Sequence, residues 1–209
     1  MIGAWFLRLA VLVSVLWLLP MLVIRAQPYD DAAVRTLLQP PEACPSPCFM
    51  GIRPGSMTVW DALDVLHMHR WVGAMEDYEF ENFQNPDGTV TLVVNWDWSG
   101  TQPTLIDPAR QGGVWVLDDR IVSIDVETEL RLGDVKLSLG WPDREQIYTT
   151  RNVQGTFYTH YAWYEQPQIL MIVANRCPVT QLDHSRVLLH WAEKAPEMPD
   201  MHNPRQACV

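Results

Sequence analysis

The sequence predicts an α+β protein in which two tandem units, each a helix followed by an antiparallel meander of strands, form one curved sheet with helices on one face. Three observations predict this fold: a hydrophobic N-terminal helix, two amphipathic helical patterns about 75 residues apart, and alternating strand patterns after each of them. The chain divides into residues 1–26, a signal peptide or membrane anchor; 27–50, a proline-rich linker; 51–128, the first α+β repeat; 129–191, the second; and 192–209, a proline-rich tail.

The hydrophobic N-terminal segment predicts where the protein works. Arg8 precedes an uninterrupted apolar run of 16 residues, Leu9 to Ile24, which is the layout of a secretory signal or a single anchor. The run is shorter than the roughly 20 residues that span a bilayer as a helix, and Ala26 supplies only half of a small-residue cleavage site. Whether the segment is cleaved or retained, we expect the chain after Gln27 to lie outside the cytoplasm.

The charge balance excludes one class of partner. The 209 residues carry a formal net charge of -10, and removal of residues 1–26 takes away two arginines and no acid, which gives -12. Such a chain repels phosphate backbones, so we expect no nucleic-acid partner. The roughly 180 residues that remain are enough for one substantial core or two small fused ones.

Four cysteines, Cys44, Cys48, Cys177 and Cys208, predict disulfides. An even number of cysteines outside the cytoplasm indicates up to two bridges, and three pairings are open. The spacing of Cys44 and Cys48 is CxxxC with two intervening prolines, unlike the CxxC of redox enzymes. We therefore interpret the cysteines as structural, ahead of catalytic thiols or a metal site.

The first repeat begins with a helix. Thr58 is the predicted N-cap, with Asp61 as its acidic capping partner, and the helix ends near His69. One apolar stripe on this helix is predicted to be buried: Val59, Ala62, Leu63 and Leu66. Two hairpins follow, with strands 78–84 and 89–98 around the turn 85–88, and strands 114–117 and 120–128 around Asp118 and Asp119.

The second repeat has the same order. Gly133 and Asp134 open its helix, and Gly140 and Pro142 stop it. Leu132, Val135 and Leu139 supply the apolar side of this helix. Strands are predicted at 146–151, 156–164 and 168–175, with 187–191 as a last edge strand.

The helix openings of the two repeats are alike and carry a resemblance. Ile52-Arg53-Pro54-Gly55 parallels Leu130-Arg131-Leu132-Gly133. With Gly55, Thr58 and the segment Leu139-Gly140-Trp141-Pro142, a glycine-started helix that ends in LG-x-P before a meander resembles the small outer-membrane-assembly lipoproteins of the SmpA/OmlA type and the beta-lactamase-inhibitor-protein fold. The segment CPSPCFMGIRPGSMT is similar to exported bacterial proteins with a PCxxGIxPGxT-type motif.

This resemblance implies a two-repeat curved sheet in a superfamily whose members bind proteins rather than catalyse reactions. The chain departs from the assembly lipoproteins in two ways. It has no cysteine close behind the hydrophobic segment to carry a lipid, and it has two repeats where they have one.

Aromatic residues in the strands are the candidate binding residues. Alternation places Trp96 and Trp98 on one face of their strand and puts Tyr158, His160 and Tyr164 together on one face of theirs. Phe157, Tyr161 and Trp163 share the opposite face of that strand. One set must be core, and we expect the set with polar tips, Tyr158, His160 and Tyr164, to be exposed for binding, together with Trp96 and Trp98.

Metal and catalytic motifs are weak. His67 and His69 lie about 200° apart around a helix, so both cannot face one ion. In the tail, Met198, Met201 and His202 could hold copper loosely, but we expect no preformed metal site and no cofactor.

Two further patterns contain the residue types of enzyme active sites but not the spacing that such sites need. Asp183, His184 and Ser185 are the residue types of a hydrolase triad, but adjacent side chains point apart and cannot form the relay. Glu79 and Glu81 share a strand face, which fits a solvated face better than an acid/base pair.

The sequence therefore predicts a non-enzymatic, extracytoplasmic protein that binds another protein at the cell envelope, attached to the membrane through residues 1–26 if these are retained. Stacking on the sugar rings of envelope glycans is the alternative function. An envelope enzyme or metal carrier is the third.

Overall fold

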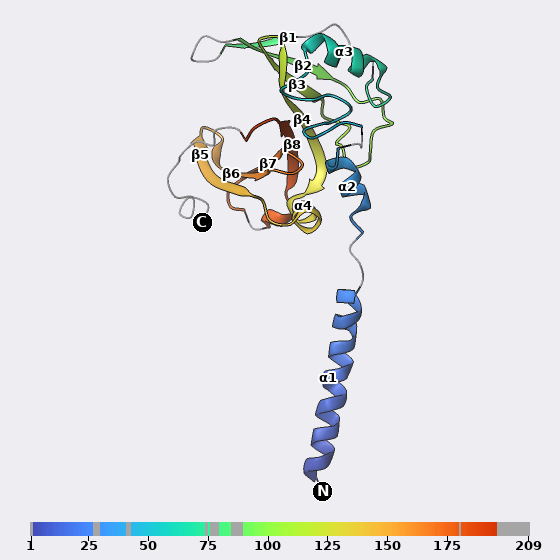
Figure 1. The fold of residues 1–209 in the computed structure, drawn as a ribbon. Coiled ribbons are helices and arrows are strands. Elements are labelled where there is room, and N and C mark those ends of the chain that lie inside the picture. The colour runs from blue at the N-terminus through green and yellow to red at the C-terminus, as the bar shows by residue number, and fades with distance from the viewer. Residues whose placement is uncertain are drawn as a thin grey trace. The chain divides into compact units, whose positions relative to one another are not determined.

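The computed structural model describes residues 2–26, 30–40, 43–73, 75, 80–84, 90–179 and 181–195. The chain forms two compact units, Met1–Asp31 and Ala32–Val209. The first unit contains helix α1 (Ile2–Ala26), on which every large apolar side chain described, between Leu9 and Leu22, is exposed (Figure 1). Within the described residues, no helix combines the length and the apolar character needed to cross a membrane.

The second unit is α+β and is built on one open antiparallel sheet of eight strands (Figure 1). The strand order is β1-β2-β3-β4-β8-β7-β6-β5. The strands are β1 (Phe80–Gln84), β2 (Val90–Trp96), β3 (Gly112–Leu117), β4 (Arg120–Arg131), β5 (Arg144–Asn152), β6 (Gly155–Tyr164), β7 (Ile169–Arg176) and β8 (Arg186–Ala192).

Strand β8 was expected at an edge, and the structure corrects this. It lies in the centre of the sheet, between β4 and β7. The reason is visible in its composition, because the apolar run Val187–Leu189 suits a strand with neighbours on both sides. The edges of the sheet are β1 and β5.

Helix α3 (Val59–Met68) confirms the first predicted helix. Thr58 is its N-cap, since the Thr58 hydroxyl accepts from the Asp61 backbone N–H at 3.2 Å and donates to Asp61 Oδ2 at 2.7 Å. Its buried residues are the predicted stripe: Val59, Ala62, Leu63 and Leu66.

Helix α4 (Leu132–Leu139) confirms the second. It stops at Gly140, whose φ of +84° favours glycine. Helix α2 (Ala32–Leu38) lies within the segment predicted as a linker, between Pro28 and Pro40 where no proline interrupts. Three of its apolar residues are buried, in helical spacing: Val34, Leu37 and Leu38.

Helices α2, α3 and α4 share one hydrophobic core with one face of the sheet. The sheet contributes alternate residues of β2, β3, β4, β6, β7 and β8 to it. The largest fully buried side chains in this core are Trp96, Trp191 and Tyr164. We call this side of the sheet the core face.

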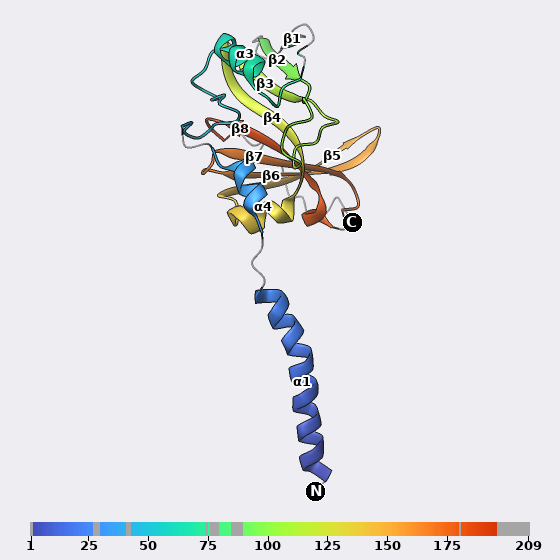
Figure 2. The ribbon, with the colours of Figure 1, turned by 90° about the vertical axis from the view of Figure 1, so that its right-hand side faces the viewer.

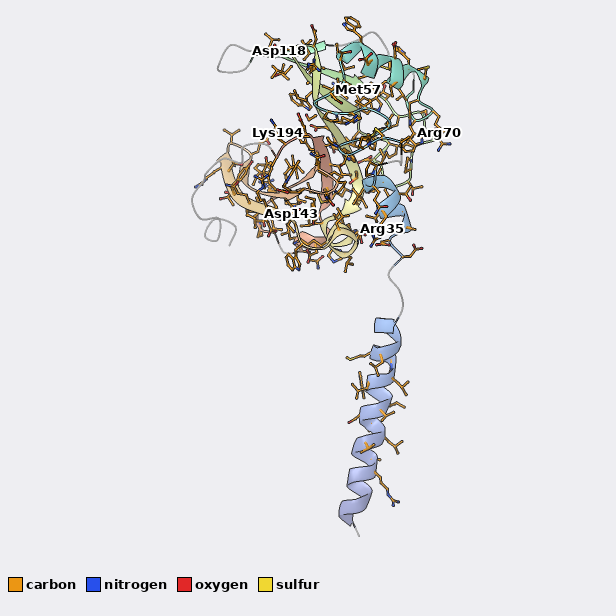
Figure 3. The ribbon with its side chains drawn as sticks, in the orientation of Figure 1. Arg35, Met57, Arg70, Asp118, Asp143 and Lys194 are labelled. Atoms are coloured by element: carbon orange, nitrogen blue, oxygen red, sulfur yellow. A yellow bond between two sulfur atoms is a disulfide. The ribbon has the colours of Figure 1, made fainter. Side chains whose placement is uncertain are left out.

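The β3–β4 hairpin turns at Asp118 and Asp119, as predicted. Both residues have positive φ, +50° and +62°, which is the backbone that a two-residue hairpin turn requires and that aspartate tolerates. The Val59 backbone N–H donates to the Asp119 carbonyl at 2.9 Å. This bond ties the start of α3 to the turn, and Asp118 lies at the same end of the sheet as α3 (Figure 3).

Gly55 in the motif before α3 has a structural reason. Its φ is +81°, and an added Cβ would collide with the Glu193 carboxylate. Its backbone N–H donates to the Ile121 carbonyl at 2.7 Å. Only glycine fits this left-handed position so close to another segment.

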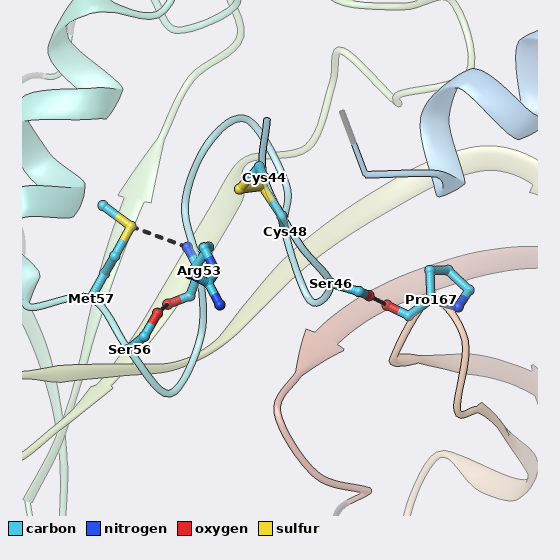
Figure 4. Close-up of a disulfide and its surroundings, with 7 residues drawn as sticks. All are labelled: Cys44, Ser46, Cys48, Arg53, Ser56, Met57 and Pro167. Atoms are coloured by element: carbon cyan, nitrogen blue, oxygen red, sulfur yellow. Dashed lines mark hydrogen bonds between the residues drawn. A yellow bond between two sulfur atoms is a disulfide. The ribbon is translucent and has the colours of Figure 1, made fainter. Parts of the chain in front are cut away.

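A disulfide joins Cys44 and Cys48 (Figure 4). Within its loop, the Ser46 hydroxyl donates to the Pro167 carbonyl in the β6–β7 turn. Immediately after it, Phe49 stacks on the core residue Trp191, with ring centroids 4.4 Å apart. The disulfide loop is thus held against the second half of the sheet.

The cap of α3 gives the first prediction. Replacement of Thr58 by Ala leaves the Asp61 N–H without its side-chain acceptor and should lower the free energy of unfolding by about 1 kcal/mol. Urea denaturation measures the change. Ser56→Ala on the same exposed loop is the control and should have little effect, since the Ser56 hydroxyl makes only a long bond of 3.4 Å to the Arg53 carbonyl.

The second prediction concerns the cysteines. The Cys44–Cys48 bond is compatible with only one of the three pairings of four cysteines, the one that joins Cys177 to Cys208, although Cys208 lies outside the described residues. Peptide mapping without reduction, on protein exported to an oxidising compartment, should recover both linked pairs. A Cys48–Cys177 peptide would contradict the structure.

Candidate binding surface

The side of the sheet opposite the core face carries two rows of side chains across five strands. Residues directly opposite each other on antiparallel strands project from the same face, so the register fixes the rows. The first row is Asp125, His190, Leu170, Trp163 and Arg144; the second is Glu127, Leu188, Ile172, Tyr161 and Gln146. We call these two rows, with their neighbours Trp115 and Tyr148, the open face.

The open face is apolar in the middle and charged at its ends. None of the row residues belongs to the core that the helices cover. Trp163 and Leu170 are buried, while Leu188, Ile172 and Tyr161 are half-buried. Asp125 and Glu127 end the rows on β4, and Arg144 ends the first row on β5.

A hydrogen-bonded triplet fixes one end of the open face. The Asp125 Oδ1 atom lies 2.5 Å from His190 Nδ1, and Asp125 Oδ2 accepts from Trp115 Nε1 at 2.9 Å. The contact with a carboxylate oxygen assigns a proton to Nδ1. No described residue hydrogen-bonds Nε2, and the His190 side chain is 19% exposed. His190 therefore offers one oriented ring nitrogen, Nε2, to a ligand.

Two tyrosines stack at the other end. The rings of Tyr148 and Tyr161 have centroids 4.9 Å apart and an interplanar angle of 19°. Burial, and then the neighbouring Tyr161 hydroxyl, raise the pKa of Tyr148. The Tyr148 hydroxyl is therefore neutral at physiological pH and can donate a hydrogen bond.

A cavity of about 350 Å³ opens beside the second row. Leu188, Ile172 and Ala174 give it apolar lining. Its charged lining is paired within the chain: Arg186 lies 3.3 Å from Asp107 and 2.7 Å from Glu129, and Arg110 lies 3.3 Å from Glu127. Both arginine side chains are more than 60% exposed, so these pairs form a solvated rim that adds little stability.

The residues chosen from the sequence lie mainly on the core face, which corrects their expected exposure. Tyr164 and His160 are buried, at 2% and 1% exposure, and Tyr158, on the same face, is half-buried. Trp96 is 1% exposed, and Trp98 packs edge-on against it with ring centroids 5.5 Å apart. Burial leaves none of these residues except Tyr158 and Trp98 accessible to a partner.

The physical reason is that alternation separates the two sets of aromatic residues but does not say which set a helix will cover. Tyr164 can be buried because its hydroxyl donates to the Gly140 carbonyl at 3.1 Å. Trp96 can be buried because the residue opposite it is Gly112, where an added Cβ would collide with the indole. Neither compensation is visible before the strands are paired.

No sequence pattern singles out Trp115, Asp125 and His190. They lie on three strands, and β4 and β8 are separated by the whole second meander, so no local spacing relates them. The only available signal was that Tyr161 lies on the face opposite Tyr164, which the structure bears out.

The histidine and triad motifs do not form sites. His69 stands edge-on to Trp71, with ring centroids 4.9 Å apart, and burial, with the charge of Arg70, lowers its pKa. Among the described residues, no group of three or more metal-ligating side chains comes together. The predicted copper ligands Met198, Met201 and His202 lie outside the described residues, as does Glu79.

The triad residues contact three separate partners. Asp183 lies 3.9 Å from Lys136, His184 Nδ1 lies 3.2 Å from an Arg131 nitrogen, and Ser185 accepts a hydrogen bond of 2.6 Å from Asn175. No relay connects them, as the sequence indicated.

His160 is an unusual core residue. Its side chain is fully buried, Glu145 Oε1 lies 2.5 Å from Nε2, and Nδ1 has no hydrogen-bond partner among the described residues. Burial lowers the pKa of His160 below its ordinary 6.5; Glu145 and Asp183 oppose this shift, and Lys136 adds to it. The folded protein therefore holds His160 neutral.

This gives a prediction for pH. Between the lowered pKa of His160 and 6.5 the unfolded chain binds more protons than the folded one, so stability is complete above pH 6.5 and falls as the pH drops through this interval. Urea unfolding at several pH values should show this slope. His160→Gln should reduce it, and His184→Gln at an exposed position should not. An unchanged slope in His160→Gln would contradict the assignment.

Comparison with family models, with curated proteins and with solved structures found no match to this chain. The resemblance carried by residues 44–58 and 139–142 therefore stays a prediction. The features that bear on function are the open face, helix α1 and the Cys44–Cys48 disulfide.

Proposed function

We propose that the protein is an exported, non-enzymatic module that binds another protein of the cell envelope through its open face. The observation that carries the proposal is the second row of this face: the half-buried Tyr161, Ile172 and Leu188 lie outside the core that the helices cover and are flanked by charged residues. Stable protein interfaces have this anatomy, with aromatic anchors inside a polar rim.

Three features suit the open face to a protein partner. Tyr161, Tyr148 and Trp115 combine a large apolar area with a polar tip, and such side chains dominate the energy of interfaces. Ile172 and Leu188 supply an apolar centre between them. The Asp125–His190–Trp115 triplet is held by two hydrogen bonds and so presents His190 without a further cost of ordering.

Export is the second part of the proposal. The exposed apolar side chains of α1 have no cover within the chain, and a helix that is apolar all round is suited to lipid or to the export machinery. The Cys44–Cys48 disulfide fits an oxidising compartment. In this proposal α1 is either the export signal or a membrane anchor.

A two-repeat origin belongs to the same proposal. Helix α3 precedes the meander β1–β4, helix α4 precedes the meander β5–β8, and the last strands of the two meanders pair with each other. This mirrored order supports the idea that the halves are repeats, and it is the arrangement that the resemblance to protein-binding folds implies.

Glycan binding is the second candidate. The stacked rings of Tyr148 and Tyr161 and the oriented Nε2 of His190 would suit a sugar ring and its hydroxyls. A glycan binder would be competed by soluble envelope saccharides, whereas a protein binder would not.

The test places a photo-crosslinking amino acid at Tyr161, on the open face, in the full-length chain in its native host. Position Trp60 on α3, which is 67% exposed, is the matched control. We expect an adduct of one defined mass with an envelope protein from position 161 only, lost when Ile172 is replaced by Glu. Equal labelling from both positions, or an adduct that survives Ile172→Glu with the fold intact, would refute the proposed face.

A further inference from the structure

Strand β5 is an edge strand with neither a bulge nor a proline to end its pairing. It is nine residues long and pairs with β6 along its whole length, from Arg144 opposite Trp163 to Asn152 opposite Gly155, with no bulge. No described segment pairs with its outer edge. It contains neither proline nor lysine, the residues that most often block an edge. The tip of the β5–β6 hairpin projects from the rest of the sheet (Figure 2).

We propose that two copies of this chain pair through their β5 strands, antiparallel and about a two-fold axis at Tyr148, so that the two sheets become one. The two-fold axis must stand perpendicular to the sheet, because only then do equivalent faces of the two copies lie on the same side. Residues directly opposite each other on the two strands then project from the same face, so their positions in the sequence differ by an even number. The axis therefore passes through a residue position, and the positions near the middle of the strand are Ile147, Tyr148 and Thr149.

Charge selects Tyr148 among these three positions. With the axis at Tyr148, Glu145 of each copy lies opposite Arg151 of the other, which makes two ion pairs related by symmetry. With the axis at Thr149, Arg151 would lie opposite Ile147. With the axis at Ile147, Glu145 would lie opposite Thr149, and Arg151 would lie opposite Asp143, which precedes β5 and already accepts the Glu165 backbone N–H at 2.8 Å. Opposite charges directly across a strand pair stabilise it, so the register at Tyr148 is the one that β5 favours.

The side chains involved are available for this contact. Arg151 is exposed and has no ion pair among the described residues. The Glu145 side chain is 35% exposed, and one of its oxygens faces His160. Strand β5 itself carries two arginines and one glutamate, so its net charge is opposite in sign to that of the whole chain.

Pairing would also join the aromatic parts of the two open faces. Tyr148 lies on the open face and stacks on Tyr161 of its own chain. At the two-fold axis it would lie directly opposite Tyr148 of the second copy. Four tyrosines would then form one continuous strip across the joint.

The register can be measured by a distance between spin labels. Val153 is fully exposed beyond the end of β5, so a Val153→Cys variant can carry a label without disturbing the fold. In the proposed register the two labelled backbones are offset by ten residues, or about 33 Å. An axis at Ile147 predicts about 40 Å and an axis at Thr149 about 26 Å. The measurement uses the full chain in detergent. If the copies associated through α1 alone, the distance between the labels at 153 would have no single defined value.

Charge reversal tests the ion pairs. Arg151→Glu places Glu opposite Glu145 twice and should weaken the pairing about tenfold. Glu145→Arg places Arg opposite Arg151 and should do the same. A mixture of these two variants restores both pairs and should form the mixed dimer at wild-type strength. Arg120→Glu, an equal charge change at the exposed first residue of β4, is the control and should leave pairing unchanged.

Circular dichroism of each variant shows that the fold persists. A monomer at all accessible concentrations, a label distance of another register, or a mixture that pairs no better than its components would overturn the proposal. Binding through the open face is measured separately by crosslinking at Tyr161, so failure of the dimer would leave the proposed function standing.

Discussion

The pairing of β4 with β8 is the contact on which the rest of the structure depends. It is the only described strand pairing between the first meander and the second, and it places Ile124 opposite Trp191 on the core face and Asp125 opposite His190 on the open face. One register thus serves both sides of the sheet. A slip of one residue would turn Trp191 away from the core and break the Asp125–His190 contact together.

Local features of the fold could be read from the sequence, and long-range ones could not. The start and the buried stripe of α3, the Asp118–Asp119 turn and the stop of α4 at Gly140 each depend on a few neighbouring residues, and the structure has all of them. The central position of β8 depends on a partner more than 50 residues away in the chain. The hydrophobic periodicity of a strand does not identify the strands with which it pairs.

The candidate surface shows the same limit at the level of side chains. Alternation correctly divided the aromatic residues of β6 into two sets, yet Tyr164 rather than Tyr161 lies in the core. The choice depends on where α4 packs and on whether a buried hydroxyl finds an acceptor, here Gly140. For His160 the nearby acceptor is Glu145 on the neighbouring strand β5, so its burial could not have been inferred before β5 and β6 were paired.

The attachment of the disulfide loop has a mechanical consequence. The segment that follows Cys44 is bound to the β6–β7 turn through Ser46 and to the centre of the sheet through Phe49 on Trp191, and shortly afterwards Gly55 is bonded to β4. A pulling force applied to the chain ahead of Cys44 would therefore be shared between both meanders at once. The sheet would be loaded near its middle, away from its edge strands, so extension would have to break several contacts together rather than peel one strand at a time.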